Sequence, residues 1–190
     1  MKYIYNDELY GEVTYSRMYS SWKKTTPFLL PFNGKECSIV FYIEFVDELY
    51  LKTKYNISHE FKLEEINREQ IEDAEKWEKE QRELYKKYLM PPSEMMRLVE
   101  DAIVADYQWQ MKENYGDEAE CVKFLGEKKA KKVMNADNRE KILNLVKLKK
   151  LILVYDGIVI LGKCDWYDTN YGIKVTSEGF VKVGLEENVY

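Results

Sequence analysis

The sequence predicts an α+β fold, and three observations lead to that class. Short segments in which apolar and polar residues alternate lie near both ends of the 190-residue chain. Between about residues 66 and 148, apolar residues instead recur at helical spacing. Strands that enclose a block of helices are typical of α+β proteins. We therefore predict one domain over residues 1–190, in which an antiparallel sheet is built from the N-terminal and C-terminal strands and a helical insertion at about 66–148 packs on one face.

The N-terminal part is expected to form strands at residues 11–15, 27–32 and 35–46. In the third strand, Ile39, Phe41 and Ile43 fall on one side, at the period of two that a strand requires. Asn33-Gly34 separates the second strand from the third, and both residues accept the positive φ angles of a two-residue hairpin turn. These two strands should therefore pair antiparallel.

Two capping residues predict where the long helices begin. Asn67 can cap a helix while Gln70 reaches back, which is a capping-box spacing. That helix should end at Pro91-Pro92, because a residue before proline avoids the helical region. Ser93 is then expected to cap a second helix, for which Gly116 is a natural stop.

Three shorter segments complete the helical part. A helix is expected over residues 118–125. The segment 127–134 is basic and lacks apolar periodicity, so a loop or a frayed helix is expected there. Asp137 followed by Glu140 has capping-box spacing and predicts a helix from Asn138 to about Lys147.

The C-terminal part predicts a meander of strands at residues 151–155, 158–164, 172–176 and 180–185. Asp156-Gly157 and Glu178-Gly179 separate neighbouring strands and favour tight turns. A loop at 167–170 separates the middle two strands.

Composition and charge argue against several classes of function. The formal net charge is −5, which opposes general attraction to nucleic acid or to an anionic membrane. No stretch is apolar enough for a signal peptide or a membrane span, so we expect a cytoplasmic protein. Cys37, Cys121 and Cys164 are odd in number and lack paired spacing, so neither a disulfide framework nor a zinc site is expected.

The sequence shows no evident set of catalytic groups. His59 is the single histidine, which leaves it without a second imidazole for a metal site or a dyad. The chain contains no G-x-S-x-G elbow, P-loop or glycine-rich dinucleotide turn. We therefore predict no catalytic, cofactor-binding or metal-binding residues and no cofactor, and we favour a function other than catalysis.

One carboxylate pair supports an alternative hypothesis. Asp165 and Asp168 flank Trp166 in a predicted turn, where they could bind a cation or act as acid and base. Aspartates in turns more often accept backbone N–H bonds. The alternative function is a small-ligand-binding protein or an enzyme that uses a cleft near these three residues.

Several short motifs, in a fixed order, carry a resemblance to a known family. They are Tyr10-Gly11-Glu12-Val13-Thr14-Tyr15, Trp22 with Pro31-Phe32 and Gly34, Ile66-Asn67 with Gln70 and Ala74, Cys164-Asp165-Trp166, Tyr171-Gly172-Ile173-Lys174-Val175, and Val183-Gly184. In these motifs the chain resembles the uncharacterised bacterial domain of unknown function 6985 family, mainly at its two ends. The family pattern has a Glu-His-Gly turn after the tryptophan, where this chain has Tyr167, Asn170 and Tyr171.

The resemblance implies a bacterial protein, and some similar small acidic proteins occur near toxin genes, where immunity proteins are expected. We predict a non-enzymatic protein that binds another protein, as an immunity protein occluding the site of a basic toxin. Charge would speed the encounter and aromatic anchors would hold the complex. The expected contact residues are Asp106, Tyr107, Trp109, Glu113, Tyr115, Asp117 and Glu118. A homo-oligomer joined through an exposed strand edge or aromatic stripe is a further alternative.

Overall fold

A computed structural model describes residues 3–16, 21–44, 50, 52, 54–55 and 67–189. Within these residues, nine strands form one sheet in the order β1-β2-β3-β5-β6-β7-β8-β9, and β4 pairs with β5 beside this path. The strands are β1 (Ile4–Asp7), β2 (Gly11–Ser16), β3 (Ser21–Lys24), β4 (Phe28–Phe32), β5 (Lys35–Glu44), β6 (Val146–Val154), β7 (Gly157–Cys164), β8 (Tyr171–Thr176) and β9 (Val181–Leu185). The last two residues of the predicted third strand, 45 and 46, lie outside the described residues.

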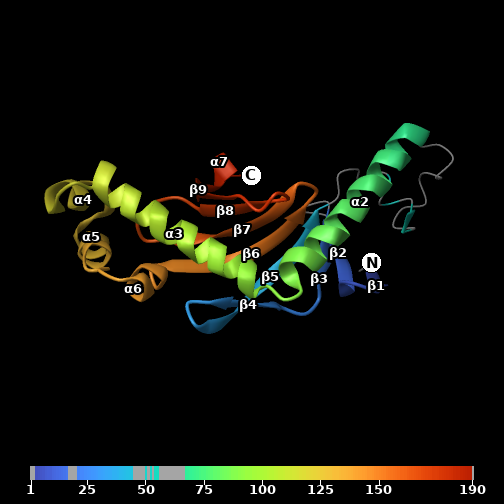
Figure 1. Cartoon of the computed structure of the whole chain (residues 1–190), viewed down its shortest axis with the longest axis horizontal. Helices are drawn as coiled ribbons and strands as arrows, with labels where there is room; N and C mark the ends of the chain where they lie inside the picture. Colours follow the sequence, from blue (N-terminus) through green and yellow to red (C-terminus); the bar gives the residue numbers. More distant parts are fainter. Residues whose placement is uncertain are drawn as a thin grey trace.

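The helices occupy the middle of the chain, apart from a short one at its end. They are α2 (Arg68–Leu89), α3 (Ser93–Glu113), α4 (Glu118–Leu125), α5 (Glu127–Met134), α6 (Arg139–Leu143) and α7 (Glu186–Val189). Figure 1 shows α4 and α5 at one end of the molecule and β1 and β2 at the other. The predicted α+β class is confirmed.

The sheet is mixed, so the prediction of an antiparallel sheet is wrong at one pair. β5 and β6 run parallel, with Phe41 opposite Leu151, whereas the other neighbouring strands pair antiparallel. A parallel pair needs a long crossover connection. The chain between Glu44 and Val146, which includes α2 to α6, provides it.

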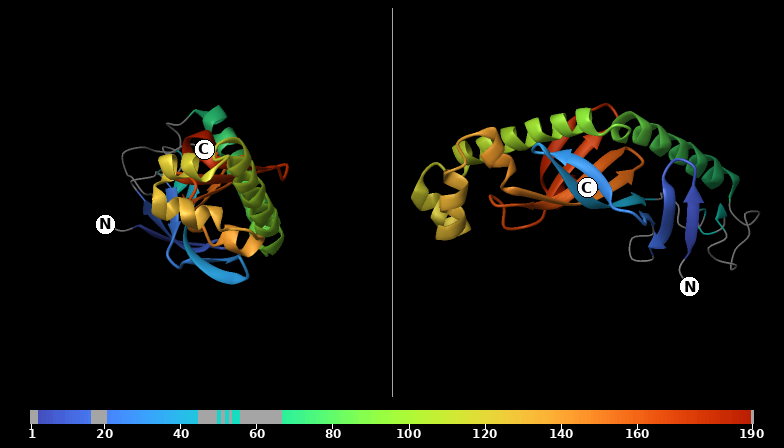
Figure 2. Two further views of the ribbon diagram at one scale, coloured as in Figure 1. Left: turned by 90° about the vertical axis from the view of Figure 1, so that its left-hand side faces the viewer. Right: turned by 90° about the horizontal axis from the view of Figure 1, so that it is seen from below.

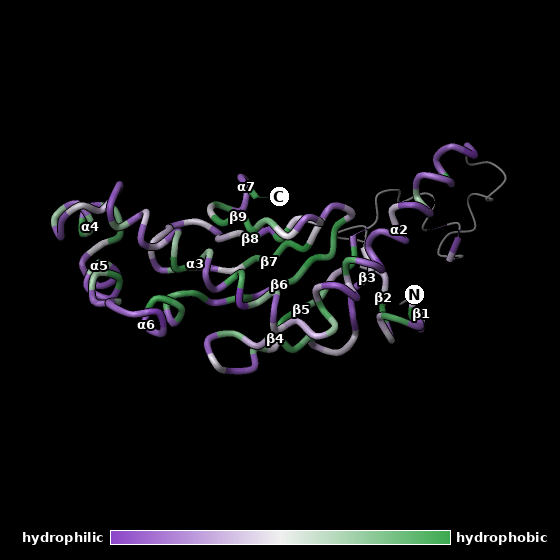
Figure 3. Tube along the Cα trace, viewed as in Figure 1, coloured by the Kyte–Doolittle hydropathy of each residue, from purple (hydrophilic) through white to green (hydrophobic). Residues whose placement is uncertain are grey.

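The main core lies between the sheet and the two long helices. α2 and α3 arch over the same side of the sheet, as Figure 2 shows. Strand residues such as Phe41, Leu151 and Ile160 alternate with outward residues and pack with Leu84 of α2 and Ile103 of α3. The opposite face carries a second, smaller apolar cluster of Tyr42, Ile152, Val154, Val159 and Leu161. β6 and β7 are consequently apolar on both faces, which is visible as their hydrophobic colour in Figure 3.

The local signals for one turn and one helix start are confirmed. Asn33 and Gly34 have φ angles of 50° and 70°, and β4 pairs antiparallel with β5 across them. The Asn67 side chain accepts a hydrogen bond from the backbone N–H of Glu69 at 3.1 Å. Ser93 does not cap α3, because Pro92 already has helical angles and Ser93 therefore lies inside the first turn.

Two of the shorter segments differ from their predictions. Residues 127–134 form the regular helix α5, in which Ala130 and Val133 are buried between lysines. The helix predicted from Asn138 to about Lys147 ends at Leu143, and Val146 begins β6 by pairing with Cys164. At residues 146–147, pairing with β7, which is distant in the sequence, thus outweighs the helical spacing of the apolar residues.

Candidate functional site

Asp106 of α3 is the centre of a hydrogen-bonded cluster beneath the segment that follows β7. Its carboxylate accepts hydrogen bonds from the indole Nε1 of Trp166 at 3.0 Å and from the hydroxyls of Tyr167 and Tyr171, each at 3.2 Å. Burial raises the pKa of Asp106, although these hydrogen bonds act in the opposite direction. The cluster fixes the segment after β7 against α3.

The turn at Asp165–Asp168 is engaged by its neighbours. Asp165 forms an ion pair with Lys132, and Asp168 forms one with Lys129 at 2.9 Å; both lysines belong to α5. The Trp166 side chain is fully buried, and its backbone carbonyl accepts a hydrogen bond from the Tyr115 hydroxyl at 2.7 Å. The three residues of the alternative ligand site therefore join the sheet to α3 and α5, and their side chains are occupied by these contacts.

Three of the predicted partner-binding residues are directed into the protein, which corrects that part of the prediction. Asp106 is held in the cluster described above. Tyr107 is buried, and its hydroxyl donates to the carbonyl of Val133 at 2.8 Å. Tyr115 is half-buried because its hydroxyl reaches Trp166. Met95, Ile103 and Tyr107 are buried on the packed side of α3, and Asp106 lies within the arc that they span.

The other four predicted residues lie at the surface. Trp109 is 55% exposed, and Glu113, Asp117 and Glu118 are exposed near the α3–α4 connection. Asp117 also caps α4 by accepting a hydrogen bond from the backbone N–H of Glu120 at 2.9 Å. Phe124 of α4 is 56% exposed beside Tyr115, with ring centroids 6.2 Å apart. The α3–α4 surface consists of Trp109, Glu113, Asp117, Glu118 and Phe124.

Phe124 was missed by the sequence reasoning, although a signal was present. Cys121 and Leu125 are buried on one side of α4. At about 100° per residue, Phe124 lies off that side of so short a helix. An aromatic residue outside the apolar stripe of a helix is therefore the feature that indicates an exposed ring here.

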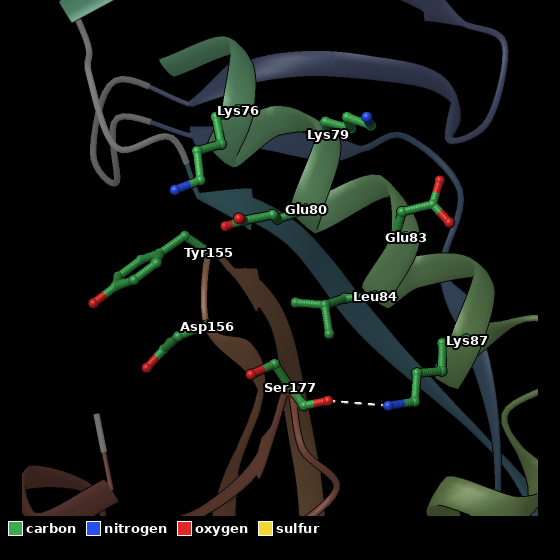
Figure 4. Close-up of a pocket in the computed structure, with 9 residues that line it drawn as sticks. All are labelled: Lys76, Lys79, Glu80, Glu83, Leu84, Lys87, Tyr155, Asp156 and Ser177. Carbon is green, nitrogen blue, oxygen red and sulfur yellow. Dashed lines mark hydrogen bonds between the residues drawn. The ribbon is translucent and has the colours of Figure 1, made fainter. Parts of the chain in front are cut away.

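A groove of about 680 Å³ runs along α2, facing the β6–β7 and β8–β9 turns (Figure 4). It is lined by Lys76, Lys79, Glu80, Glu83, Leu84, Lys87, Tyr155, Asp156 and Ser177. Lys87 donates to the carbonyl of Ser177 at 3.0 Å, which joins the two walls. α2 contributes both lysines and glutamates, and this described lining contains neither histidine nor cysteine. The groove therefore offers a mixed-charge surface but no nucleophile paired with a base.

A half-buried charge network connects the N-terminal strands to α2. Arg82 contacts the Asp7 carboxylate through both terminal nitrogens, at 3.2 and 2.5 Å, and lies 3.4 Å from Glu78. Glu78 in turn binds Lys54 at 2.6 Å. Burial alone would raise the pKa of Asp7, but the Arg82 guanidinium and two backbone N–H groups hold it below its ordinary value. The adjoining void of about 10 Å³ has room for about one water molecule, so the network is part of the packing.

Within the ranges that the structure describes, no three histidine, cysteine, aspartate or glutamate side chains are grouped to hold a metal ion. His59 lies outside those ranges. No described helix is long and apolar enough to cross a membrane. Comparison with protein-family models, with curated proteins and with solved structures gives no match. The resemblance to the domain of unknown function 6985 family stays a prediction that depends on the quoted motifs.

Proposed function

We propose that this chain binds another protein and neutralises it, as an immunity protein does when it occludes the site of a toxin. The observation that carries the proposal is the exposure of two large aromatic side chains, Trp109 and Phe124, on consecutive helices. Aromatic side chains are over-represented among the residues that dominate binding energy in protein interfaces. Their exposure supports a contact surface more than it supports a packing role.

Charge supports a basic partner. Glu113 lies one turn beyond Trp109 on α3, Asp117 and Glu118 lie at the start of α4, and the whole chain has a formal charge of −5. An acidic surface speeds the encounter with a basic one and disfavours acidic competitors. The aromatic rings then supply the apolar contact that slows dissociation.

The test uses the product of the gene beside this one as the first partner to be purified. Binding is measured by isothermal titration calorimetry with the wild type and with the double variant Trp109→Ala/Phe124→Ala. We expect the double variant to lose at least about tenfold in affinity, since truncation of one interface hot spot costs about 2 kcal/mol or more.

Phe180→Ala is the matched control. Phe180 is 68% exposed but belongs to the β8–β9 turn, outside the α3–α4 surface. Its truncation should leave affinity within about twofold. Equal losses in both variants would exclude the α3–α4 surface as the contact. If neither the neighbouring product nor any protein captured from the source cell binds the wild type, the proposal fails.

A further inference from the structure

The face of the sheet opposite α2 and α3 contains a hollow whose position follows from strand register. Trp22 and Ile43 face the main core, so their neighbours Ser21 and Tyr42 face the other way. Register places Tyr42 opposite Ile152. On β7, Leu161 is the register partner of Lys150 and extends this row of residues across the sheet. A hollow of about 220 Å³ lies over this row.

Gly172 determines how the hollow is closed on its β8 side. It is the partner of Leu161 in the register of β7 and β8. A Cβ atom at Gly172 would lie 2.5 Å from Val189 Cγ2 and 3.0 Å from Glu186 Cα, so only glycine lets α7 approach the sheet this closely. α7 lies beside β8 and β9 (Figure 1), and Glu186 consequently borders the hollow.

One polar atom in the lining is buried and unsatisfied. Ser21 is 1% exposed, and no described residue makes a hydrogen bond with its Oγ. A buried hydroxyl without a partner lowers the stability of the folded protein. Ser21 lines the hollow, so a molecule bound there could make the missing hydrogen bond.

We propose that this hollow binds a small aliphatic molecule that carries a primary ammonium group. Tyr42, Ile152 and Leu161 give an apolar base for an aliphatic body. Of the charged side chains in the described lining, Glu44 and Lys150 are opposite in sign and each has an interaction of its own, so the Glu186 carboxylate supplies the net negative charge. This favours a cation over an anion of the same size, and the Ser21 Oγ accepts one of the ammonium hydrogens. The site is separate from the α3–α4 surface and does not depend on the proposed partner.

The first experiment compares two probes that share a body and differ in charge. Hexylamine is protonated at pH 7, as lysine is, and hexanoate is deprotonated. Binding is followed by calorimetry and by NMR of the Ile and Leu methyl groups. We expect saturable binding of hexylamine with shifts at Ile152 and Leu161, and at least about tenfold weaker binding of hexanoate. Equal binding of both probes, or no saturable binding of hexylamine, overturns the proposal.

Variants then assign the contacts. Glu186→Gln should weaken hexylamine binding about tenfold because a charge-assisted contact is lost. Glu187→Gln is its matched control on the same helix, outside the lining of the hollow, and should leave binding unchanged. Ser21→Ala should weaken binding without lowering the thermal midpoint of unfolding, because its Oγ makes no bond with the described residues.

This combination separates a ligand contact from a structural role. A Ser21→Ala variant that unfolds at lower temperature but binds normally would show that Oγ serves the fold. Glu186→Gln and Glu187→Gln variants that bind hexylamine equally would show that no specific contact reaches Glu186. Either result overturns the assignment of the site.

Discussion

Asp106 is a carboxylate whose donors come from a distant part of the chain. The indole of Trp166 and two tyrosine hydroxyls bind it, some sixty residues further on. Burial raises its pKa above the ordinary value of 3.8, and the hydrogen bonds only partly offset this effect. The folded protein therefore holds a proton on Asp106 more tightly than the unfolded chain does.

The raised pKa predicts how stability changes with pH. In the window from 3.8 up to the folded pKa, the folded state binds more protons than the unfolded state, so the contribution of Asp106 to stability falls as pH rises. Urea unfolding of the wild type and of Asp106→Asn across this window provides the measurement. The free energy of unfolding of the wild type minus that of the variant should fall with pH; a rising difference would contradict the assignment.

Asp7→Asn serves as a control of opposite sign. The pKa of Asp7 is lowered, so its contribution to stability is present above 3.8 and is lost as pH falls through the folded pKa. The free energy of unfolding of the wild type minus that of Asp7→Asn should therefore rise with pH. If the wild-type minus variant difference in the free energy of unfolding changed with pH in the same direction for both variants, these two side chains would not set the pH dependence of stability.

At the scale of elements, a single arginine attaches the N-terminal hairpin to the longest helix. Arg82 of α2 binds Asp7 of β1, and its guanidinium lies 5.2 Å from the Tyr10 ring centre. Asp7 is buried, and among the described residues Arg82 is the cation that forms an ion pair with it. The β1–β2 hairpin is consequently fixed to α2 by charge as well as by apolar contact.

Arg82→Met should lower the free energy of unfolding by about 3 kcal/mol, because it leaves the Asp7 charge buried and unpaired. Lys86→Met, one turn further along α2, is the control. Lys86 pairs with Glu83 at the surface, so this substitution should lower the free energy of unfolding by less than about 1 kcal/mol. Chemical denaturation of both variants gives the comparison. Equal losses would show that the Asp7–Arg82 pair contributes no more than a surface pair.

Local signals in the sequence predicted the elements that depend on a few neighbouring residues. Asn33-Gly34 and Asn67 belong to this group because a turn and a cap are formed by residues close in sequence. The start of β6 at Val146 and the parallel pairing of β5 depend on partners far along the chain, which no local pattern contains. Helix α5 was missed because only Ala130 and Val133 mark its buried side.

The same division applies to the candidate sites. Trp109, Glu113, Asp117 and Glu118 lie at the surface, and their contact with a partner stays a prediction. The inward position of Tyr107 could have been inferred from the helical spacing that it shares with Ile103. The contact between Asp7 and Arg82 and the hollow beside Gly172 join segments that only the complete fold brings together.

At the scale of the whole molecule, the excess of negative charge bears on how fast a partner arrives. The formal charge of −5 produces a field that attracts a basic protein before contact. Salt screens this attraction, and the screening length falls from about 10 Å at 0.1 M to about 3 Å at 1 M. Aromatic contact in the formed complex depends much less on salt.

We therefore expect the association rate with the proposed basic partner to fall about tenfold between about 0.05 and 0.5 M salt, with a much smaller change in dissociation rate. Surface plasmon resonance at several salt concentrations measures both. Glu118→Gln should reduce the salt dependence of association, whereas Glu36→Gln, an exposed change on β5, should affect it less. A salt effect confined to dissociation would contradict the proposed steering.

The parallel pairing of β5 with β6 has a consequence for synthesis on the ribosome. β5 is complete when Glu44 has been made, but its partner residues on β6 begin only at Lys150. While roughly a hundred further residues are synthesised, one edge of β5 lacks β6, the strand that pairs with it in the folded protein. Unpaired apolar strand edges invite contact between nascent chains. A fragment that stops before residue 150 should therefore aggregate, and chaperones that shield β5 should matter most during that interval.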